Sequence, residues 1–338
     1  MIKEAIDTLV SGNSLTFEQA AGVMEELMSG EATPAQFGAF VTALRIKGET
    51  VDEIAGLASV MRARAVPVRA SRPLVDTCGT GGDSSSSFNI STAAALIAAG
   101  AGLRVAKHGN RAMSSHCGSA DVLEALGVKI DLGAEAVAEC LEKVGIGFMF
   151  APIFHPAMKH AAAPRREIGV RTVFNILGPL TNPARAEYQV IGVPTKELGE
   201  KIALVLHRLG TKHALVVHGT DGMDEISITA SSLVWEVNES GVSPPYQVSP
   251  PHFGFKEASL AEIKGGTPEE SAKILRRILE GERGARRDVA VMNTAAALVA
   301  GNMAADLKEG ARLAEEAIDS RQAMEKLDKL VRLSQSLG

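Results

Sequence analysis

The sequence has few cysteines and lacks long hydrophobic runs. Among its 338 residues are three cysteines, Cys78, Cys117 and Cys140, an odd number at wide spacings that indicates neither a disulfide framework nor a metal-binding CxxC motif. No stretch of 18 strongly apolar residues occurs, and Glu4 and Asp7 stand where a signal peptide would be apolar. We therefore expect a cytoplasmic protein that does not enter a membrane.

The sequence also lacks any block of charge of one sign. Its 40 acidic and 35 basic residues give a formal net charge of −5. Because nucleic acids and anionic membranes attract basic patches, we expect neither as a main partner, although a local anion site is compatible with this balance. The length and the hydrophobic content of 46% are sufficient for two domains with sizeable cores.

The N-terminal region repeats one pattern, in which a capping residue precedes an amphipathic run and a break. Thr16 with Gln19 and Thr50 with Glu53 have the spacing of capping boxes, and Thr33 precedes a proline at a first helical position. We therefore predict four helices within the first 66 residues.

After this region, short runs of apolar and β-branched residues alternate with helical patterns. The strand-like runs are LVD, LRVA, VKI, IGFMF, YQVIGV and HALVVHG, and farther on ISITA and LVWEV, which precede a Pro- and Ser-rich edge excursion. This alternation predicts an α/β fold with a mostly parallel central sheet flanked by helices. Ligands of such sheets bind at the carboxyl ends of the strands, so we expect the site in the loops there.

We divide the chain into two domains on this basis. Residues 71–154 and 184–338 are expected to form the α/β domain. Residues 1–70 are expected to form a smaller all-helical domain, completed by helices from about 155–183, where the sequence has helical pieces and no strand pattern.

A glycine-rich turn follows the first predicted strand. Gly79, Gly81 and Gly82 lie within four positions, a polar tract leads from them into a helix predicted to begin near Ser91, and their backbone amides could converge on phosphate oxygens. Side-chain donors at the same helix start are Asn89, Ser91 and Thr92. The alternative is a tight turn without a ligand, but the added donors favour a phosphate site. The spacing matches neither the Rossmann fingerprint nor the P-loop.

Basic residues follow the second predicted strand. Lys107, His108 and Arg111 lie beside the flexible Gly109. A single surface base is usually only solvated, but parallel topology places this loop next to the glycine-rich turn, which favours a second phosphate contact.

Adjacent acids follow the strand HALVVHG. Asp224 and Glu225 offer hard carboxylate oxygens that suit Mg²⁺, an ion that commonly bridges to substrate phosphates. Two solvated acids in a turn are the alternative, which the neighbouring anion site disfavours.

Three arginines lie in the segment without a strand pattern. Each of Arg165, Arg166 and Arg171 could pair bidentately with a substrate carboxylate. The alternative for each is a position on a helix surface without a ligand. Spacing alone does not choose among them.

These motifs occur together in a known family. DTCGTGGD, NISTAAA, KHGNRAMSS, GSADVLEALG, PRREIGVRTVFNILGPLTNP, HGTDGMDEIS and LRIKGET follow one another in the family's order, and the chain resembles the anthranilate phosphoribosyltransferases over essentially its whole length. The resemblance implies transfer of the phosphoribosyl group of phosphoribosyl pyrophosphate (PRPP) to the amine of anthranilate, in tryptophan biosynthesis. It also implies a homodimer formed through the helical domain and an active site in the cleft beside the α/β domain.

The resemblance assigns roles to individual residues. For PRPP it implies Gly79, Gly82, Asp83, Ser87, Asn89, Ile90, Ser91, Thr92, Lys107, His108, Gly109, Asn110, Arg111, Ala112, Met113, Ser114, Ser115 and Ser119. For anthranilate it implies Gly79, His108, Asn110 and Arg165. For Mg²⁺, with two ions per site, it implies Ser91, Asp224 and Glu225. No residue is assigned as a general acid or base.

The sequence departs from the family pattern at two places. Residues 84–87 are four serines where relatives often carry Gly and Thr, and His116-Cys117 stands where relatives tend to have Lys-Ser. The serine hydroxyls preserve the donors, so Ser87 is expected to serve, and only a peripheral phosphate contact at His116 is in doubt.

Three other functions compete with this assignment. A pyrimidine nucleoside phosphorylase shares the helical N-terminus and the glycine loop, but the paired acids favour a metal-bound pyrophosphate substrate. A related transferase could accept another aromatic amine. A non-catalytic phosphometabolite-binding protein is expected to lack the magnesium acids, the glycine loop or KHGNR, and all three are present.

Overall fold

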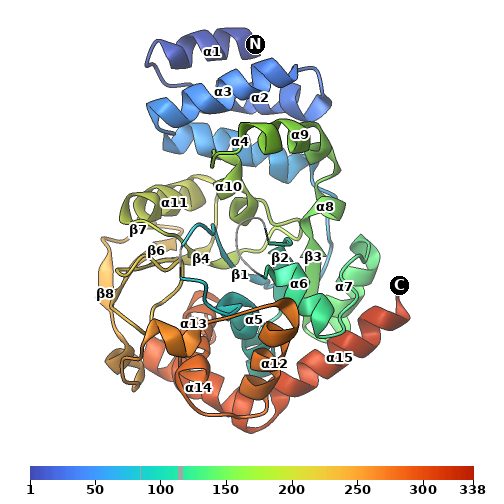
Figure 1. Cartoon of the computed structure of the whole chain (residues 1–338), viewed down its shortest axis with the longest axis vertical. Coiled ribbons are helices and arrows are strands. Elements are labelled where there is room, and N and C mark those ends of the chain that lie inside the picture. Colours follow the sequence, from blue (N-terminus) through green and yellow to red (C-terminus); the bar gives the residue numbers. More distant parts are fainter. Residues whose placement is uncertain (84, 113–116) are drawn as a thin grey trace.

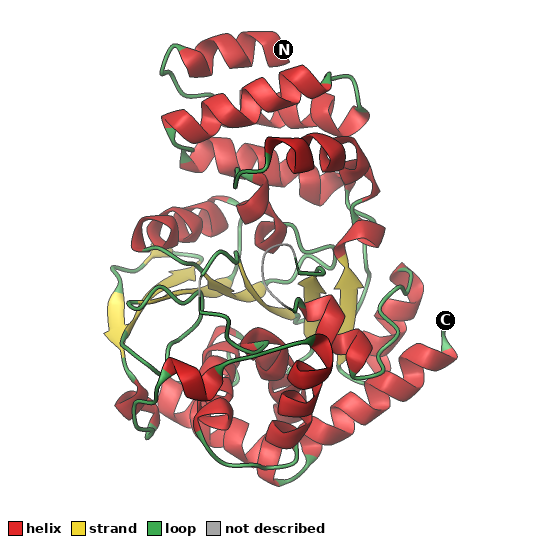
Figure 2. Cartoon of the chain, viewed as in Figure 1, coloured by secondary structure: helices red, strands yellow, loops and turns green. Residues whose placement is uncertain are grey.

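The computed structural model describes residues 1–83, 85–112 and 117–338. The N-terminal helices are stacked at one end of the molecule, and below them a central sheet carries helices on both faces (Figure 1, Figure 2). Within the described residues, no helix combines the length and apolarity needed to cross a membrane.

Four helices form the N-terminal region, as the capping pattern predicts. Thr16, Thr33 and Thr50 each accept a hydrogen bond from the backbone amide three residues later, and the side chain of that residue accepts one from the threonine's amide. The helices are α1 (Ile2–Val10), α2 (Phe17–Ser29), α3 (Pro34–Lys47) and α4 (Val51–Arg64). Reciprocal caps therefore fix where three of these helices begin.

A later segment of the chain returns to these helices. Within it α9 (Lys159–Ile168) packs against α2 and α3. The flanking elements are α8 (Ala151–Phe154), η1 (Pro156–Met158), α10 (Phe174–Leu177) and η2 (Gly178–Leu180). Every residue of the segment is described and none is in a strand, in agreement with the sequence prediction.

The described residues form an eight-stranded sheet with the order β3-β2-β1-β4-β5-β6-β7, in which β8 also pairs with β6. The strands are β1 (Val75–Gly79), β2 (Val105–Gly109), β3 (Ile146–Phe150), β4 (Tyr188–Gly192), β5 (His213–Gly219), β6 (Ser232–Asn238), β7 (Gly241–Val242) and β8 (Tyr246–Val248). Strands β1 to β5 are parallel, and β6 to β8 add an antiparallel edge. The predicted mostly parallel α/β fold is confirmed.

Two of the predicted strands are loops instead. In VKI the amide of Lys129 donates a 3.0 Å hydrogen bond to the hydroxyl of Ser334 on a C-terminal helix. In ISITA the amide of Ile226 donates a 2.9 Å bond to the side chain of Asn293. Both runs alternate apolar and polar residues because their apolar side chains enter the core. The amides of Lys129 and Ile226, however, donate to side chains of helices and not to a neighbouring strand. Alternation alone therefore gave the wrong prediction.

Helices cover both faces of the sheet. The remaining elements are α5 (Ile90–Ala101), α6 (Ser119–Ala125), α7 (Ala134–Lys143), α11 (Lys196–Arg208), η3 (Pro250–Phe253), η4 (Leu260–Ile263), α12 (Pro268–Leu279), α13 (Ala285–Ala300), α14 (Leu307–Asp319) and α15 (Gln322–Ser336). Helices α5 and α13 pack side by side against β1 and β4, with α14 and α15 behind α5, and α11 packs against β5 and β6 (Figure 1).

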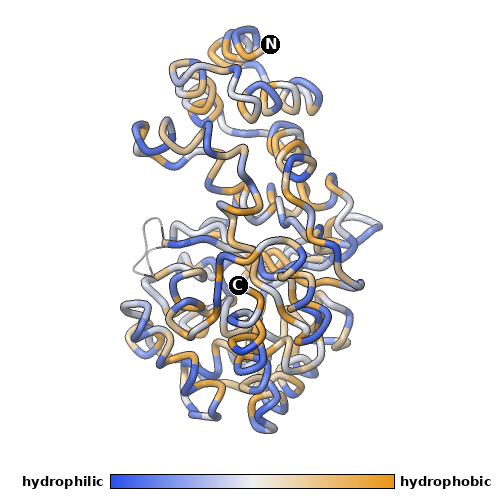
Figure 3. The backbone as a smooth tube through the Cα atoms, turned by 90° about the vertical axis from the view of Figure 1, so that its right-hand side faces the viewer, coloured by the Kyte–Doolittle hydropathy of each residue, from blue (hydrophilic) through white to orange (hydrophobic). Residues whose placement is uncertain are grey.

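Buried hydrophobic side chains of the described residues form two clusters. One lies between the sheet and the layer of α5 and α13. The other begins in the N-terminal helices, passes through Ile202 of α11, and ends at Val216 of β5 and Trp235 of β6. Figure 3 shows hydrophobic segments running from the helical part into the sheet part. The N-terminal helices therefore share a core with one face of the sheet.

The contact between α2 and α4 depends on a glycine. A Cβ atom at Gly56 would overlap the carbonyl oxygen of Phe17 and lie 3.0 Å from the Cβ of Ala20. We expect Gly56→Ala to lower the free energy of unfolding by about 1–3 kcal/mol through overpacking, measured by urea denaturation. The control is Gly38→Ala on α3, where a Cβ would meet no described atom within 4 Å, and which should be neutral or stabilising. Equal stability of the two variants would contradict the prediction.

Candidate functional site

The loop after β1 closes around an acidic side chain from a distant part of the sequence. Gly81 and Gly82 have φ angles of +66° and +91°, which other residues rarely adopt. The Gly81 amide donates a hydrogen bond to Asp224 Oδ2 at 2.8 Å, and a Cβ atom at Gly79 would overlap the same carboxylate. The structure therefore brings the predicted glycine turn and the predicted acidic pair together.

Carboxylates concentrate at this turn. Removal from water, and then repulsion from Asp83, raises the pKa of Asp224 to about 7. Removal from water, and then repulsion from Asp224, raises the pKa of Glu225 well above its usual range, while Lys107 opposes this rise. Such unneutralised oxygens suit a hard divalent cation. In the described part of the chain no group of three His, Cys, Asp or Glu residues is placed to hold a metal ion by itself.

A buried lysine connects the first two strands to the start of α5. Lys107 on β2 is 2% exposed, and its Nζ donates to the carbonyl oxygen of Thr77 at 2.6 Å and to Ser91 Oγ at 3.4 Å. Burial lowers the pKa of Lys107, which the nearby Asp76 opposes. A positive charge is thereby held beside the N-terminus of a helix, where an anion is stabilised.

The residues at the start of α5 differ in their burial and in their hydrogen bonds. Asn89, at the N-cap, donates its side-chain amide to the carbonyl oxygen of Cys117 at 3.0 Å, which ties the first loop to the second. Ile90 is buried in the core below the loop. The hydroxyl of Thr92 is buried with no hydrogen-bond partner among the described residues, so it has a free donor for a ligand or water.

The second loop packs closely on the start of α6. A Cβ atom at Gly109 would overlap Ser119 Oγ, so this glycine allows the loop to approach the helix. The carbonyl oxygen of Asn110 accepts hydrogen bonds from the Ala120 amide at 3.2 Å and from Ser119 Oγ at 3.4 Å. The structure thus places Ser119 directly beside the KHGN motif.

Arg111 and Ala112, the next residues of the second loop, bind acidic side chains of α6. The Arg111 guanidinium pairs with Asp121 at 2.9 Å and with Glu124 at 2.7 Å, and the Ala112 amide donates to Asp121 Oδ2 at 2.9 Å. The charge of Arg111 is therefore already paired in this structure. The predicted PRPP residues that lie outside the described residues are Met113, Ser114 and Ser115.

Two histidine rings lie against each other at a tilt, His108 near the end of β2 and His155 directly after α8. The ring centroids of His108 and His155 are 5.0 Å apart, and both side chains are buried. Burial lowers the pKa of His108 to about 3 and that of His155 to about 4, so both rings are neutral at pH 7. Sequence reasoning missed His155, because a lone histidine among prolines carries no distinguishing signal.

The three arginines have different environments. Arg165 on α9 is partly buried with its guanidinium 5.5 Å from the Phe174 ring centroid, and burial lowers its pKa. Arg166 is exposed. Arg171 donates two hydrogen bonds to carbonyl oxygens of the glycine turn. The structure therefore separates three residues that the sequence left equivalent.

Sequence reasoning missed a buried carboxylate beneath the site. Asp76 on β1 accepts hydrogen bonds from Asn182 Nδ2 at 2.7 Å and from the His108 amide at 3.3 Å. Burial raises its pKa to about 6, which Lys107 opposes. The signal that could have found it is an acid inside the buried strand VDTCG, because a charge there requires partners.

The serine tract also has a partner that the sequence did not reveal. Ser87 forms an antiparallel bridge with Lys264, flanked by bonds from the Phe88 amide to Ile263 and from the Gly265 amide to the carbonyl of Ser86. The side chain of Ser85 lies between Asp83 and Ser87. A distant segment therefore holds the serine tract that follows the glycine turn.

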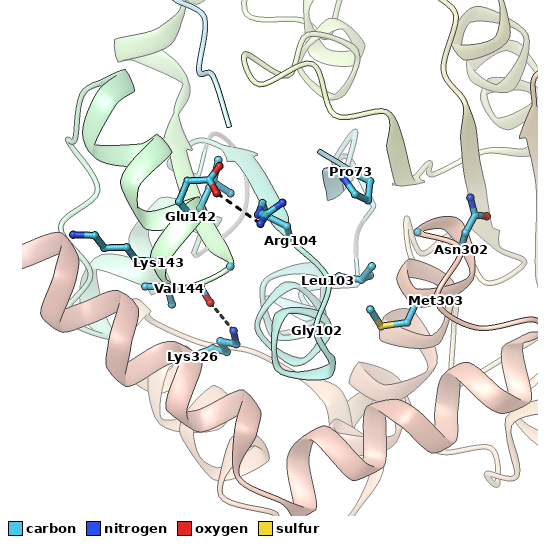
Figure 4. Close-up of a pocket in the computed structure, with 13 residues that line it drawn as sticks. Pro73, Gly102, Leu103, Arg104, Glu142, Lys143, Val144, Asn302, Met303 and Lys326 are labelled. Atoms are coloured by element: carbon cyan, nitrogen blue, oxygen red, sulfur yellow. Dashed lines mark hydrogen bonds and ion pairs between the residues drawn. The ribbon is translucent and has the colours of Figure 1, made fainter. Parts of the chain in front are cut away.

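A cavity of about 520 Å³ lies at the opposite edge of the sheet, next to the residues that precede β2 and β3 (Figure 4). Its cationic side chains already have partners. Arg104 pairs with Glu142 at 3.7 Å, and Lys326 Nζ donates to the carbonyl oxygen of Val144 at 2.6 Å. We therefore place the functional site at the glycine turn.

Comparison with known proteins agrees with this geometry. The chain matches the model "Glycosyl transferase family, a/b domain" over residues 71–324 and "Glycosyl transferase family, helical bundle domain" over residues 3–65. It is 59% identical to a protein of Dehalococcoides mccartyi named anthranilate phosphoribosyltransferase, over 100% of this chain and 99% of that relative.

Solved structures show the same similarity. The anthranilate phosphoribosyltransferase of Thermus thermophilus superposes with a TM-score of 0.93 at 45% identity, over 98% of this chain and 99% of that one. The enzyme of Saccharomyces cerevisiae in complex with PRPP and Mg gives a TM-score of 0.91 at 28% identity, over 99% and 98%. The chain therefore belongs to the anthranilate phosphoribosyltransferase family.

Proposed function

We propose that this protein transfers the 5-phosphoribosyl group of PRPP to the amine of anthranilate, giving N-(5-phosphoribosyl)anthranilate and pyrophosphate in tryptophan biosynthesis. The observation that carries the proposal is the glycine turn closed on Asp224 at the start of α5, in a chain 59% identical over its whole length to a named anthranilate phosphoribosyltransferase. The yeast relative, whose structure contains PRPP and Mg, supports the same substrate and ion for this chain.

Stabilising the leaving group is the central chemical task. Cleavage of the C1–O bond leaves negative charge on pyrophosphate and positive charge on the ribosyl ring. Bound Mg²⁺ would neutralise the developing charge on pyrophosphate. We assign two ions to Ser91, Asp224 and Glu225, of which Asp224 accepts the Gly81 amide and Ser91 Oγ lies 3.4 Å from Lys107 Nζ. We assign Lys107 and the Gly82 amide to the phosphates.

The aromatic amine needs placement more than activation. Its nitrogen is neutral at pH 7, so positioning against C1 supplies the advantage, and no general base is assigned. We assign the carboxylate of anthranilate to Arg165 and Asn110 and its ring to the neighbourhood of Gly79 and the neutral His108. The partly buried Arg165 suits this role, because a guanidinium shielded from water pairs more strongly with a carboxylate.

The remaining assignments concern the division into domains, the oligomeric state and the location of the protein in the cell. We propose an all-helical domain of residues 1–70 completed by residues 155–183, and an α/β domain of residues 71–154 and 184–338, which the two family matches and the packing of α9 on α2 and α3 support. We further propose a cytoplasmic homodimer formed through the helical domain. Val10 and Ile46 support it, because they are 67% and 82% exposed on helices that pack together.

The reaction is tested by following anthranilate fluorescence with purified protein, PRPP and Mg²⁺, omitting each component in turn. We expect loss of signal only when protein, PRPP, anthranilate and Mg²⁺ are all present. Stable fluorescence from folded protein that binds PRPP would refute the assigned reaction.

The role of Arg165 is tested with Arg165→Met, which keeps an aliphatic contact with Phe174 and removes the charge. We expect the apparent KM for anthranilate to rise about tenfold or more, the effect of losing a charge-assisted hydrogen bond, with little change in the KM for PRPP. The exposed Arg166→Met is the matched control. Unchanged anthranilate kinetics in Arg165→Met would remove the assignment.

Neutral histidines predict a dependence of stability on pH. Because folding lowers both pKa values below the ordinary 6.5, the unfolded chain takes up protons that the folded chain does not as pH falls from about 6.5 to about 4. The free energy of unfolding therefore decreases as the pH is lowered through this range. We expect His155→Phe to reduce this slope by about 1.4 kcal/mol per pH unit near pH 5, measured by urea denaturation from pH 7 to pH 5. Equal slopes would show that His155 is protonated in the folded protein.

A further inference from the structure

Arg171 contacts both the glycine turn and the N-terminal helices. Its Nη2 donates to the carbonyl oxygens of Thr80 at 3.1 Å and Gly81 at 2.9 Å. Its own carbonyl oxygen accepts a hydrogen bond from Arg45 on α3. One residue therefore joins the helical part of the molecule, through its backbone, to the phosphate-site turn, through its side chain.

These contacts determine where the amides of the turn point. In a trans peptide the carbonyl and the following N–H point in opposite directions. With the Thr80 carbonyl held by Arg171, the Gly81 amide points away from the guanidinium and reaches Asp224 at 2.8 Å. With the Gly81 carbonyl held in the same way, the Gly82 amide also points away from Arg171.

Apart from the bonds to Arg171 and the bond between the Gly81 amide and Asp224, the described contacts of the turn leave these peptides free to rotate. Gly81 and Gly82 both have positive φ angles, and glycine has access to many backbone conformations. A Cβ atom at Gly82 would overlap the guanidinium of Arg171, so the absence of a side chain there allows the arginine to approach. The Thr80 amide, bonded to the Gly192 carbonyl at 2.9 Å, anchors the start of the turn.

We propose that Arg171 is a positioning residue, which directs the Gly81 amide onto Asp224 and the Gly82 amide toward the pyrophosphate of PRPP, and makes that orientation depend on the placement of the N-terminal helices. The inference rests on the proposed assignment of this turn to PRPP. It differs from the role given to Arg165, because Arg171 acts through the turn and contacts no substrate atom.

The test compares Arg171→Met, Arg171→Lys and the control Arg166→Met by steady-state kinetics and by calorimetric titration with PRPP and Mg²⁺ in the absence of anthranilate. We expect Arg171→Met to raise the KM and the Kd for PRPP about tenfold or more, with the KM for anthranilate unchanged. Arg171→Lys keeps the charge but loses the planar fork that holds two carbonyls, so its values should lie between those of Arg171→Met and the wild type. Arg166→Met should match the wild type.

Three results would overturn the proposal. Wild-type KM and Kd values for PRPP in Arg171→Lys alone would mean that only the charge of Arg171 matters. A raised KM for anthranilate alone would mean that Arg171 acts on the amine substrate. Wild-type PRPP values in both variants would show that the turn is organised without it. If Arg171→Met fails to fold by circular dichroism, the PRPP values of Arg171→Lys decide in the same way.

The proposed function and this inference fail differently. A wild-type protein that neither binds nor consumes PRPP contradicts the assignment of the turn to PRPP. A wild-type protein that is active, with Arg171 variants that resemble it, contradicts only the positioning role.

Discussion

The removal of neighbouring carboxylates from water, together with the repulsion between them, is the constraint to which the rest of the site responds. Asp224 and Glu225 lie close to Asp83, and removal from water together with mutual repulsion raises the pKa values of the adjacent pair. The chain offsets this cost locally with the Gly81 amide and the buried Lys107. The close approach of Asp224 to the sheet explains the glycines at the ends of β1 and β4, where a Cβ would overlap Asp224. Hard carboxylate oxygens grouped in this way are the ligands that a divalent cation prefers.

Much of the architecture could be predicted from the sequence because its signals are local. The capping threonines mark three helix starts, and the alternation of apolar runs with helices gives a mostly parallel sheet. The glycine turn and the adjacent acids were also visible as separate motifs, and parallel topology predicted that the loops would be neighbours. Their direct contact through the Gly81 amide is a fact of the structure alone.

The rest could not be predicted, because it depends on contacts between segments far apart in the chain. Ser87 pairs with Lys264, and the Asp76 carboxylate accepts a hydrogen bond from Asn182. A backbone amide in the loop VKI donates a hydrogen bond to a hydroxyl on the last helix. No local pattern marks such pairs. Three arginines within one short segment looked alike in sequence, and their different burial and partners separate them only in the folded chain.

The bridge between the serine tract and the segment Ile263–Gly265 has a consequence for the order of synthesis. A ribosome produces the helices, the glycine turn and the parallel strands well before it produces Lys264. A nascent chain that has reached Val248 therefore has all the described strands, while the serine tract still lacks Lys264 and the larger core still lacks α13. The bridge that closes the serine tract is therefore acquired late, and an interrupted translation product that ends before this segment has the sheet strands but an open serine tract and an incomplete core.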